Sequence, residues 1–194
     1  MAIAQALDEF SCISPSVMER LNRTVALVGM MGAGKSSVGR RLAARLGVSF
    51  HDADAEIEMA AGCSINELFE RFGEPAFRDG ERRVITRLLS EPAHVLATGG
   101  GAFIEPQTHA ALKARTLTIW IKAPLELLLE RVSRRETRPL LRNVDQRAML
   151  EKLLAERTPI YEQADITIDS KPGPHGLAVD EIVTELKRRE LVSA

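Results

Sequence analysis

Cysteine is scarce in this sequence. The chain has only two, Cys12 and Cys63, which are far apart and form no CxxC pair. This spacing argues against a cysteine metal site and against a disulfide framework, and it suits a reducing compartment. We expect neither cysteine to take part in chemistry.

Long apolar runs and an excess of either charge are missing as well. No segment has the apolar length that a bilayer-crossing helix needs, and residues 1–10 lack the basic start of a signal peptide. The 26 basic and 27 acidic residues nearly cancel, which argues against a nucleic-acid or anionic membrane partner. The sequence thus predicts a cytoplasmic protein that binds neither nucleic acid nor membrane.

The length and composition fit one domain. With 194 residues, 45% of them hydrophobic, the chain is long enough for a single sizeable core. Residues 1–22 are predicted to be an N-terminal extension, with a short helix over 17–21 capped by Ser16. Residues 23–194 are predicted to form the domain.

Short apolar runs alternate with helical stretches along that domain. This alternation predicts a three-layer α/β fold, in which a five-stranded parallel sheet is flanked by helices. The expected strands are 24–28, 49–51, 94–97, 117–121 and 166–168. Ligands of such a sheet bind at the carboxyl ends of its strands.

A helical insertion and a basic segment stand out from this alternation. The insertion, about 52–90, has a helix start at the capping box Ser64-Ile-Asn-Glu67 and a break near Gly73 and Pro75. We expect it to form the substrate-binding wall of a cleft. The basic segment SRRETRPLLRN is either a solvated surface or a mobile lid over about 133–144.

The string GMMGAGKS, residues 29–36, matches the phosphate-binding pattern G-x-x-x-x-G-K-[ST] between an expected strand and an expected helix. Glycines let backbone N–H groups point at phosphate oxygens, and the helix N-terminus adds its dipole. Lys35 is expected to reach the β- and γ-phosphates, and the Ser36 hydroxyl to bind Mg²⁺. The match predicts a P-loop NTPase fold with an ATP site made by Gly32, Ala33, Gly34, Lys35, Ser36 and Ser37.

A carboxylate for the metal is missing from its usual place. P-loop proteins normally have an Asp that ends a neighbouring strand, but the runs at 94–97 and 117–121 end without one. The acids that close a strand are Asp52 and Asp54. We predict that Asp52 holds Mg²⁺ through water while Asp54 faces the acceptor hydroxyl. The alternative is that this pair only caps the helix expected from about Ala55.

Two further features concern the acceptor. The string Gly99-Gly-Gly101 follows the third expected strand, and its entropic cost favours a close approach of backbone to a ligand over a simple turn. Arg78 and Arg157 come from separate helical stretches, and two guanidinium groups suit a planar carboxylate. A surface salt bridge is the alternative for either arginine alone.

Together these motifs resemble the shikimate kinase family. The strings GMMGAGKSSVGRRLA, HDADAEIE, SINELFERFGEPAFRDGE, LATGGGA, RETRPLL and ERTPIYEQAD occur in that family's order and approximate spacing, over about 22–186. The resemblance implies a nucleoside monophosphate kinase-like fold with a core, a substrate-binding insertion and a lid. It also implies a monomer that phosphorylates the 3-hydroxyl of shikimate from MgATP, in chorismate and aromatic amino acid biosynthesis.

The same resemblance implies roles for individual residues. Shikimate would be bound by Asp54, Arg78, Gly100 and Arg157, with Gly99 and Gly101 beside them. Ser36 and Asp52 would serve Mg²⁺. Arg138 would be the lid arginine on the phosphates, Arg131 would lie against the adenine, and Lys171-Pro-Gly-Pro174 would cover the other adenine face.

The catalytic residues we expect are Lys35, Asp54 and Arg138. Phosphoryl transfer depends mostly on positioning and on neutralising charge over the γ-phosphoryl oxygens, so Lys35, Mg²⁺ and Arg138 supply most of what is needed. Asp54 would orient the attacking hydroxyl, either as a base or as a positioning group.

Three other functions share part of this pattern. A gluconate or nucleotide kinase would have the same architecture, and Phe69, Phe72 and Phe77 in the insertion would allow a nucleotide acceptor to stack. A GTP-dependent switch protein should carry N-K-x-D and D-x-x-G motifs, and neither occurs. The third is an idle nucleotide-binding module, against which the complete set of expected catalytic residues argues.

Overall fold

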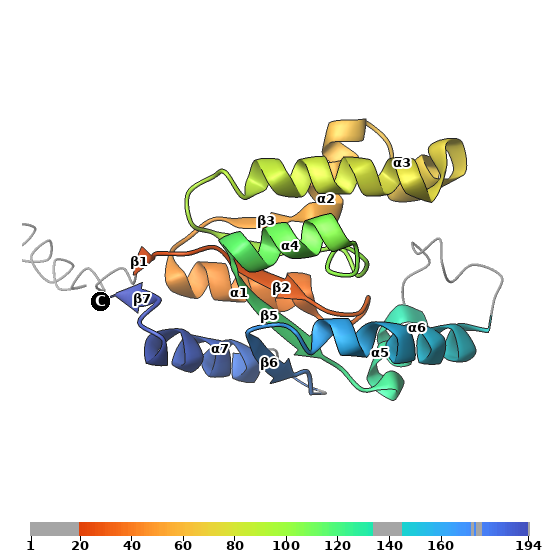
Figure 1. Cartoon of the computed structure of the whole chain (residues 1–194). Helices are drawn as coiled ribbons and strands as arrows, with labels where there is room; N and C mark the ends of the chain where they lie inside the picture. Colours follow the sequence, from red (N-terminus) through yellow and green to blue (C-terminus); the bar gives the residue numbers. More distant parts are fainter. Residues whose placement is uncertain (1–19, 134–144, 172, 174–175, 194) are drawn as a thin grey trace, which may run out of the picture.

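A five-stranded parallel sheet forms the centre of the computed structural model, which describes residues 20–133, 145–171, 173 and 176–193 (Figure 1). Its strands, in their order across the sheet, are β3 (Phe50–Asp52), β4 (Val95–Ala97), β2 (Val25–Val28), β5 (Leu117–Lys122) and β6 (Ile166–Asp169). Every neighbouring pair is parallel. All five predicted strands are confirmed, each within one residue at either end.

Helices flank this sheet, as the α/β pattern predicts. In the described part of the chain they are α1 (Lys35–Leu46), α2 (Ala53–Ala61), α3 (Ile65–Leu88), α4 (Pro106–Arg115), α5 (Leu125–Ser133), α6 (Gln146–Tyr161) and α7 (Gly176–Arg188). Helix α1 contacts α7 and β4, while α4 contacts α3 and β5. The arrangement is the predicted P-loop NTPase fold.

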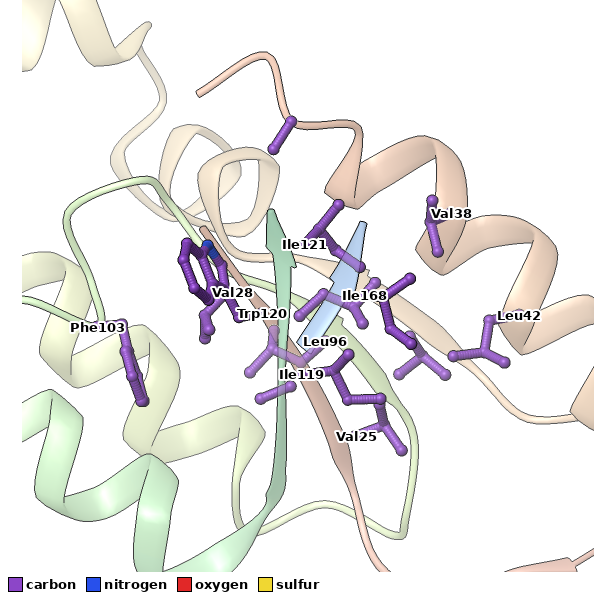
Figure 2. Close-up of a cluster of buried hydrophobic side chains, with 14 of the residues drawn as sticks. Val25, Val28, Val38, Leu42, Leu96, Phe103, Ile119, Trp120, Ile121 and Ile168 are labelled. Atoms are coloured by element: carbon purple, nitrogen blue, oxygen red, sulfur yellow. The ribbon is translucent and has the colours of Figure 1, made fainter. Parts of the chain in front are cut away.

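The core lies on both sides of the strands. All four residues of β2, Val-Ala-Leu-Val, are fully buried, as expected for a strand with helices on both of its faces. Figure 2 shows the strands between Val38 and Leu42 of α1 on one side and Phe103 on the other. Burial of each large aliphatic side chain stabilises the fold by roughly 1.5–3 kcal/mol.

The strand order indicates at which edge of the sheet a ligand is expected to bind. The chain passes from β2 to β3, returns to β4, and then crosses β2 to reach β5 and β6. Its direction across the sheet thus reverses beside β2, and ligands of open α/β sheets bind outside the strand ends at such a point. The loops that leave β2, β3 and β4 all begin at this edge.

The insertion has the predicted capping box and the predicted break. The Ser64 hydroxyl accepts the N–H of Glu67, and the Glu67 carboxylate accepts the N–H of Ser64 at 2.8 Å. Within α3, Gly73 has a left-handed φ of 76° and a non-helical ψ of 174°, two residues before Pro75. Helix α2 packs against α3, so the insertion is a helical pair beside the sheet.

The short helix predicted over 17–21 is wrong where the structure describes it. Arg20 and Leu21 form β1 (Arg20–Leu21), which pairs antiparallel with β7 (Val192–Ser193). The backbone N–H of Asn22 donates to the Leu191 carbonyl at 3.2 Å. Pairing with the far end of the chain overrides the local helical pattern, and that pairing has no local sequence signal.

Candidate active site

The phosphate loop, residues 29–34, joins β2 to α1 and requires glycine at both of its ends. Gly29 has a φ of 132°, and a Cβ there would lie 2.7 Å from the carbonyl oxygen of Ile121 and 3.1 Å from Cδ1 of Trp120. Gly34 caps α1 with a left-handed φ of 104° and without a capping side chain. No side chain therefore competes for the first N–H groups of α1, which suits an anion.

Lys35 begins α1 and lies over the loop that precedes it. Its side chain is buried, and Nζ donates to the carbonyl oxygens of Gly29 at 2.8 Å and Met30 at 2.9 Å. A buried ammonium group needs such partners. The cation is thus held against the loop that the sequence predicts to bind phosphate.

Asp52 connects the end of β3 to the first turn of α1, directly after the phosphate loop. The Ser36 hydroxyl donates to Oδ2 of Asp52 at 2.6 Å. The other oxygen, Oδ1, accepts the N–H of Asp54 at 3.2 Å and so caps α2, which begins at Ala53 and not at the expected Ala55. Asp52 is therefore a helix cap and a neighbour of Ser36 at once, while Asp54 lies inside the helix.

A cavity of about 290 Å³ lies between the insertion and the carboxyl ends of the strands. Its lining residues are Met31, Asp54, Glu58, Ser64, Ile65, Asn66, Phe69, Phe77, Arg78, Glu81, Gly99, Gly100, Gly101 and Arg157. The structure thus brings together the predicted acceptor residues from three separate segments. A cavity with an apolar wall and a few charged groups is typical of a small-molecule site.

A side chain on any of the three glycines after β4 would crowd a neighbouring protein group. A Cβ on Gly99 would lie 2.6 Å from Oε1 of Glu81 and 2.8 Å from Oδ1 of Asp54, and a Cβ on Gly101 would overlap the guanidinium of Arg78. A Cβ on Gly100 would lie 3.2 Å from the backbone nitrogen of Met31. These neighbours are protein groups, and the predicted close approach to a ligand stays a prediction.

Arg78 is held by two carboxylates of its own helix. Its Nη1 donates to Oε2 of Glu81 at 2.6 Å, its Nη2 donates to Oε1 of Glu74 at 3.1 Å, and its guanidinium lies 5.1 Å from the Phe77 ring centre. Burial acts to lower the pKa of Arg78, but the two carboxylates outweigh it and raise the pKa above its ordinary value. Arg78 therefore stays a cation.

Glu81 is a buried acid that the sequence reasoning missed. Its side chain is 1% exposed, and Oε1 has no hydrogen-bond partner among the described residues. Desolvation raises its pKa, the Arg78 charge opposes this, and the Asp54 charge adds to it. Its position three residues after Arg78 on a predicted helix was the available signal, because residues at i and i+3 lie on one face.

Arg157 reaches the middle glycine from α6. Its Nη1 donates to the Gly100 carbonyl oxygen at 3.1 Å. The Tyr161 hydroxyl, one helical turn further on, donates to the same oxygen at 2.5 Å. A role was predicted for Arg157 but none for Tyr161, although the spacing i, i+4 places them on one helix face.

Arg131 lies against the carbonyl side of the phosphate loop. Its Nη1 donates to the carbonyl oxygens of Gly32 at 3.3 Å and Ala33 at 3.0 Å, and to the hydroxyl of Ser170 at 3.0 Å. Its Nη2 donates to the Lys171 carbonyl at 3.4 Å. Burial lowers the pKa of Arg131. The side chain thus links the phosphate loop to the start of the segment predicted to cover adenine.

Three predictions fall wholly or partly on undescribed residues. Arg138 and the predicted lid lie outside the described residues, except Ser133, which ends α5. Residues 172 and 174 of the predicted adenine loop also lie outside them.

Ser37 lies in the first turn of α1, where its carbonyl oxygen accepts a hydrogen bond from Nη1 of Arg41 at 2.9 Å. None of the helices within the described ranges has both the length and the apolar character to cross a membrane.

Comparison with known proteins gives one consistent family. The shikimate kinase family model matches residues 31–187. A shikimate kinase from Nitrobacter winogradskyi is 58% identical over 167 residues, covering 86% of this chain and 78% of that relative. One from Caulobacter vibrioides is 54% identical over 166 residues, covering 86% and 83%.

A solved structure agrees with this. It is the shikimate kinase from Acinetobacter baumannii in complex with shikimate, which is 39% identical, has a TM-score of 0.85, and covers 87% of this chain and 95% of that one. The match thus extends from sequence to fold, and the range of the family model contains every residue that lines the cavity. The chain belongs to the shikimate kinase family.

Proposed function

We propose that this chain transfers the γ-phosphoryl group of ATP to the 3-hydroxyl of shikimate. Family membership supports this activity, and the Acinetobacter relative was solved with shikimate bound. The observation that carries the proposal is the packing of Gly100 against Met31 of the phosphate loop, which also lines the cavity. Donor loop and acceptor cavity thus share a wall, as a direct transfer between two bound substrates requires.

The donor is proposed to bind along residues 32–37. Backbone N–H groups at the start of α1 would face the phosphate oxygens, helped by the helix dipole. Lys35 would exchange the carbonyl oxygens of Gly29 and Met30 for oxygens of the β- and γ-phosphates. This exchange keeps the ammonium group paired in both states.

The residues at the Ser36–Asp52 contact fit a magnesium ion. Mg²⁺ prefers oxygen ligands, keeps several waters and takes few ligands from the protein. A hydroxyl and a carboxylate 2.6 Å apart suit this preference, and the described residues include no cluster of three or more His, Cys, Asp or Glu that could hold a metal instead. Ser36 is proposed to bind the ion directly and Asp52 through water. When bound, Mg²⁺ would neutralise charge on the phosphate oxygens.

The acceptor is proposed to bind in the cavity. Arg78 and Arg157 would hold the shikimate carboxylate together with the backbone of residues 99–101, since both guanidinium groups line the same cavity. Hydrogen bonds to a charged group contribute about 1.5–3 kcal/mol each. Asp54, which lines the cavity and lies two residues after Asp52, would accept a hydrogen bond from the 3-hydroxyl and orient it.

The remaining roles rest on the family resemblance. Arg138 is proposed to neutralise charge on the transferred phosphoryl group, and Arg131 to lie against the adenine. We also propose that the protein is a cytoplasmic monomer. We further propose that it has no nucleic-acid or membrane partner, which its net charge of -1 supports. Analytical ultracentrifugation tests the monomer, because a dimer would sediment at twice the mass.

One assay separates this function from its rivals. ATP consumption is measured separately with shikimate, with gluconate and with nucleoside monophosphates. We expect turnover with shikimate alone, because among these acceptors only shikimate combines a carboxylate with hydroxyls on a carbon ring. Turnover with another acceptor and none with shikimate would contradict the proposal, and no turnover with any would favour an idle nucleotide-binding module.

A further inference from the structure

Tyr161 is the last residue of α6 and its side chain is almost completely enclosed. It is 1% exposed, yet it carries a hydroxyl that must find a partner once water is excluded. That partner is the carbonyl oxygen of Gly100 in the acceptor cavity, 2.5 Å from the phenol oxygen. Burial raises the pKa of Tyr161 to about 12, so the phenol remains a donor at neutral pH.

The ring of Tyr161 is fixed from three directions. It stacks on Trp120 of β5 with a centroid separation of 5.9 Å and lies parallel to Phe103 at 6.4 Å. Its hydroxyl also lies 4.0 Å from the sulfur of Met30 in the phosphate loop. These contacts hold the ring so that its hydroxyl lies much closer to the Gly100 carbonyl oxygen than to the Met30 sulfur.

The Gly100 carbonyl needs such an anchor. Three consecutive glycines have more backbone freedom than any other tripeptide, so the loop sequence does not select one conformation. A planar trans peptide that is fixed at its carbonyl is fixed at its N–H as well. The Tyr161 hydrogen bond therefore helps to orient the peptide between Gly100 and Gly101, on the wall of the cavity.

Arg157 depends on the same oxygen. Its Nη1 donates to the Gly100 carbonyl at 3.1 Å, from the same face of α6 as Tyr161. The two donors thus share one acceptor, which has two lone pairs to offer. If the Tyr161 bond is lost, the carbonyl can turn, and the guanidinium loses the contact that orients it.

We infer that Tyr161 is a positioning residue of the acceptor site, which fixes the Gly100 peptide and through it the Arg157 guanidinium for the substrate carboxylate. This inference rests on the proposed function, because the carboxylate is that of shikimate. Tyr161 does not touch the reacting atoms in this assignment. Its effect is on acceptor binding, with little effect on ATP binding.

The test is the variant Tyr161→Phe, which removes the hydroxyl and keeps the stacked ring. We expect the KM for shikimate to rise about tenfold, the order for one lost positioning hydrogen bond. The KM for ATP should change less than about twofold. Equal rises in both KM values, or no rise in a folded variant, would overturn the inference.

Thr116→Val is the matched control. Thr116 is also fully buried, and its hydroxyl donates to the Leu112 carbonyl at 2.7 Å, at the C-terminal end of α4. This variant loses the same kind of bond, so thermal unfolding should report a similar loss of stability, but the KM for shikimate should stay at the wild-type value. A rise in KM for both variants would show that lost stability alone causes it.

A second measurement does not depend on Tyr161→Phe folding. Tyr161 is the only tyrosine of the chain, so growth with 3-fluorotyrosine labels this residue alone. We expect the fluorine NMR resonance of the wild-type chain to shift on addition of shikimate, and an unchanged resonance at saturation would overturn the inference. Wild-type protein that does not phosphorylate shikimate would instead refute the proposed function.

Discussion

The Ser36 hydroxyl donates to Oδ2 of Asp52 over 2.6 Å, while Oδ1 of the same carboxylate caps the helix that carries Asp54. One side chain thus connects the first turn of α1 to the first of the predicted acceptor residues. The proposed metal site would then lie between the two proposed substrate sites, where charge on the phosphate would develop during transfer.

Replacement of Asp52 by Asn distinguishes its role as a helix cap from its proposed role at the metal site. Asn caps a helix about as well as Asp, so we expect Asp52→Asn to change the free energy of unfolding by less than about 0.5 kcal/mol. The carboxylate charge is lost, however, and changes in groups that support a metal typically weaken its binding by about 10–100-fold. Activity titrated with Mg²⁺ should therefore show a half-maximal concentration at least about tenfold higher. The same Mg²⁺ dependence as the wild type would exclude Asp52 from the metal site.

Asp54 offers a sharper test of the acceptor half. Asp54→Asn keeps the size of the side chain but cannot take the hydroxyl proton or attract it as strongly. We expect turnover to fall by roughly 1000-fold or more, within the range for a lost general base or orienting group. Circular dichroism should show an unchanged fold. A folded variant that retains most of its activity would mean that Asp54 does not face the reacting hydroxyl.

The role proposed for Arg138 can be tested with a second arginine of the same basic segment as the control. Arg138→Ala should lower kcat by roughly 100-fold while the KM for shikimate stays nearly constant, because the lost contact would be made only in the transition state. Arg135→Ala, for which we propose no role, should have wild-type kinetics. Equal effects of the two substitutions would favour the alternative of a solvated basic surface.

The strands and the phosphate loop could be predicted because their signals are local. Each strand is a short apolar run, and burial on both faces leaves such a run few alternatives. The loop pattern sets glycines, Lys35 and Ser36 within eight residues, so its geometry follows from its own sequence. Arg78 and Arg157 were found by their residue type, and the structure brings both to one cavity.

The groups that hold these residues could not be predicted with the same certainty. Glu81, Tyr161 and Ser170 contact the predicted site residues Arg78, Gly100 and Arg131. These contacts join residues that are distant in the sequence or depend on the direction in which a side chain points. The pairing of β1 with β7 joins the two ends of the chain and has no local pattern. Contacts of this kind depend on tertiary packing, which a single sequence does not contain.

Glu81 predicts a pH dependence of stability. Desolvation raises its pKa above the ordinary 4.5, so the folded state holds this proton more tightly than the unfolded state. The contribution of Glu81 to stability is therefore complete below pH 4.5 and is lost as the pH rises through the folded-state pKa. Glu81→Gln stays neutral and lacks this dependence.

Urea denaturation of both proteins at a series of pH values measures this effect. The wild-type free energy of unfolding minus that of Glu81→Gln should fall as the pH increases above 4.5. The subtraction removes other carboxyls, such as Asp165, whose pKa is lowered and whose contribution has the opposite sign. A difference that grows with pH would mean that the Arg78 charge, and not burial, dominates at Glu81.

Gly99 and Gly80 provide a matched pair of glycine substitutions. Gly80 lies within α3, and a Cβ there would have no neighbouring atom within 4 Å. Gly80→Ala should therefore stabilise the protein by about 0.5–1 kcal/mol and leave kcat/KM unchanged. Gly99→Ala would place a Cβ 2.8 Å from Oδ1 of Asp54 and 2.6 Å from Oε1 of Glu81, so both carboxylates must move.

A displacement of about 1 Å at a reacting group can cost about 100-fold in rate. Overpacking typically destabilises a protein by about 1–3 kcal/mol. We therefore expect Gly99→Ala to lower kcat/KM for shikimate by roughly 100-fold, and thermal unfolding to report the loss of stability. The KM for ATP should change little, because the two carboxylates that a Cβ on Gly99 would displace do not belong to the phosphate loop. Equal kinetics for the two alanine variants would show that Asp54 and Glu81 can move without loss of function, and the acceptor site would then require less fixed geometry than we propose.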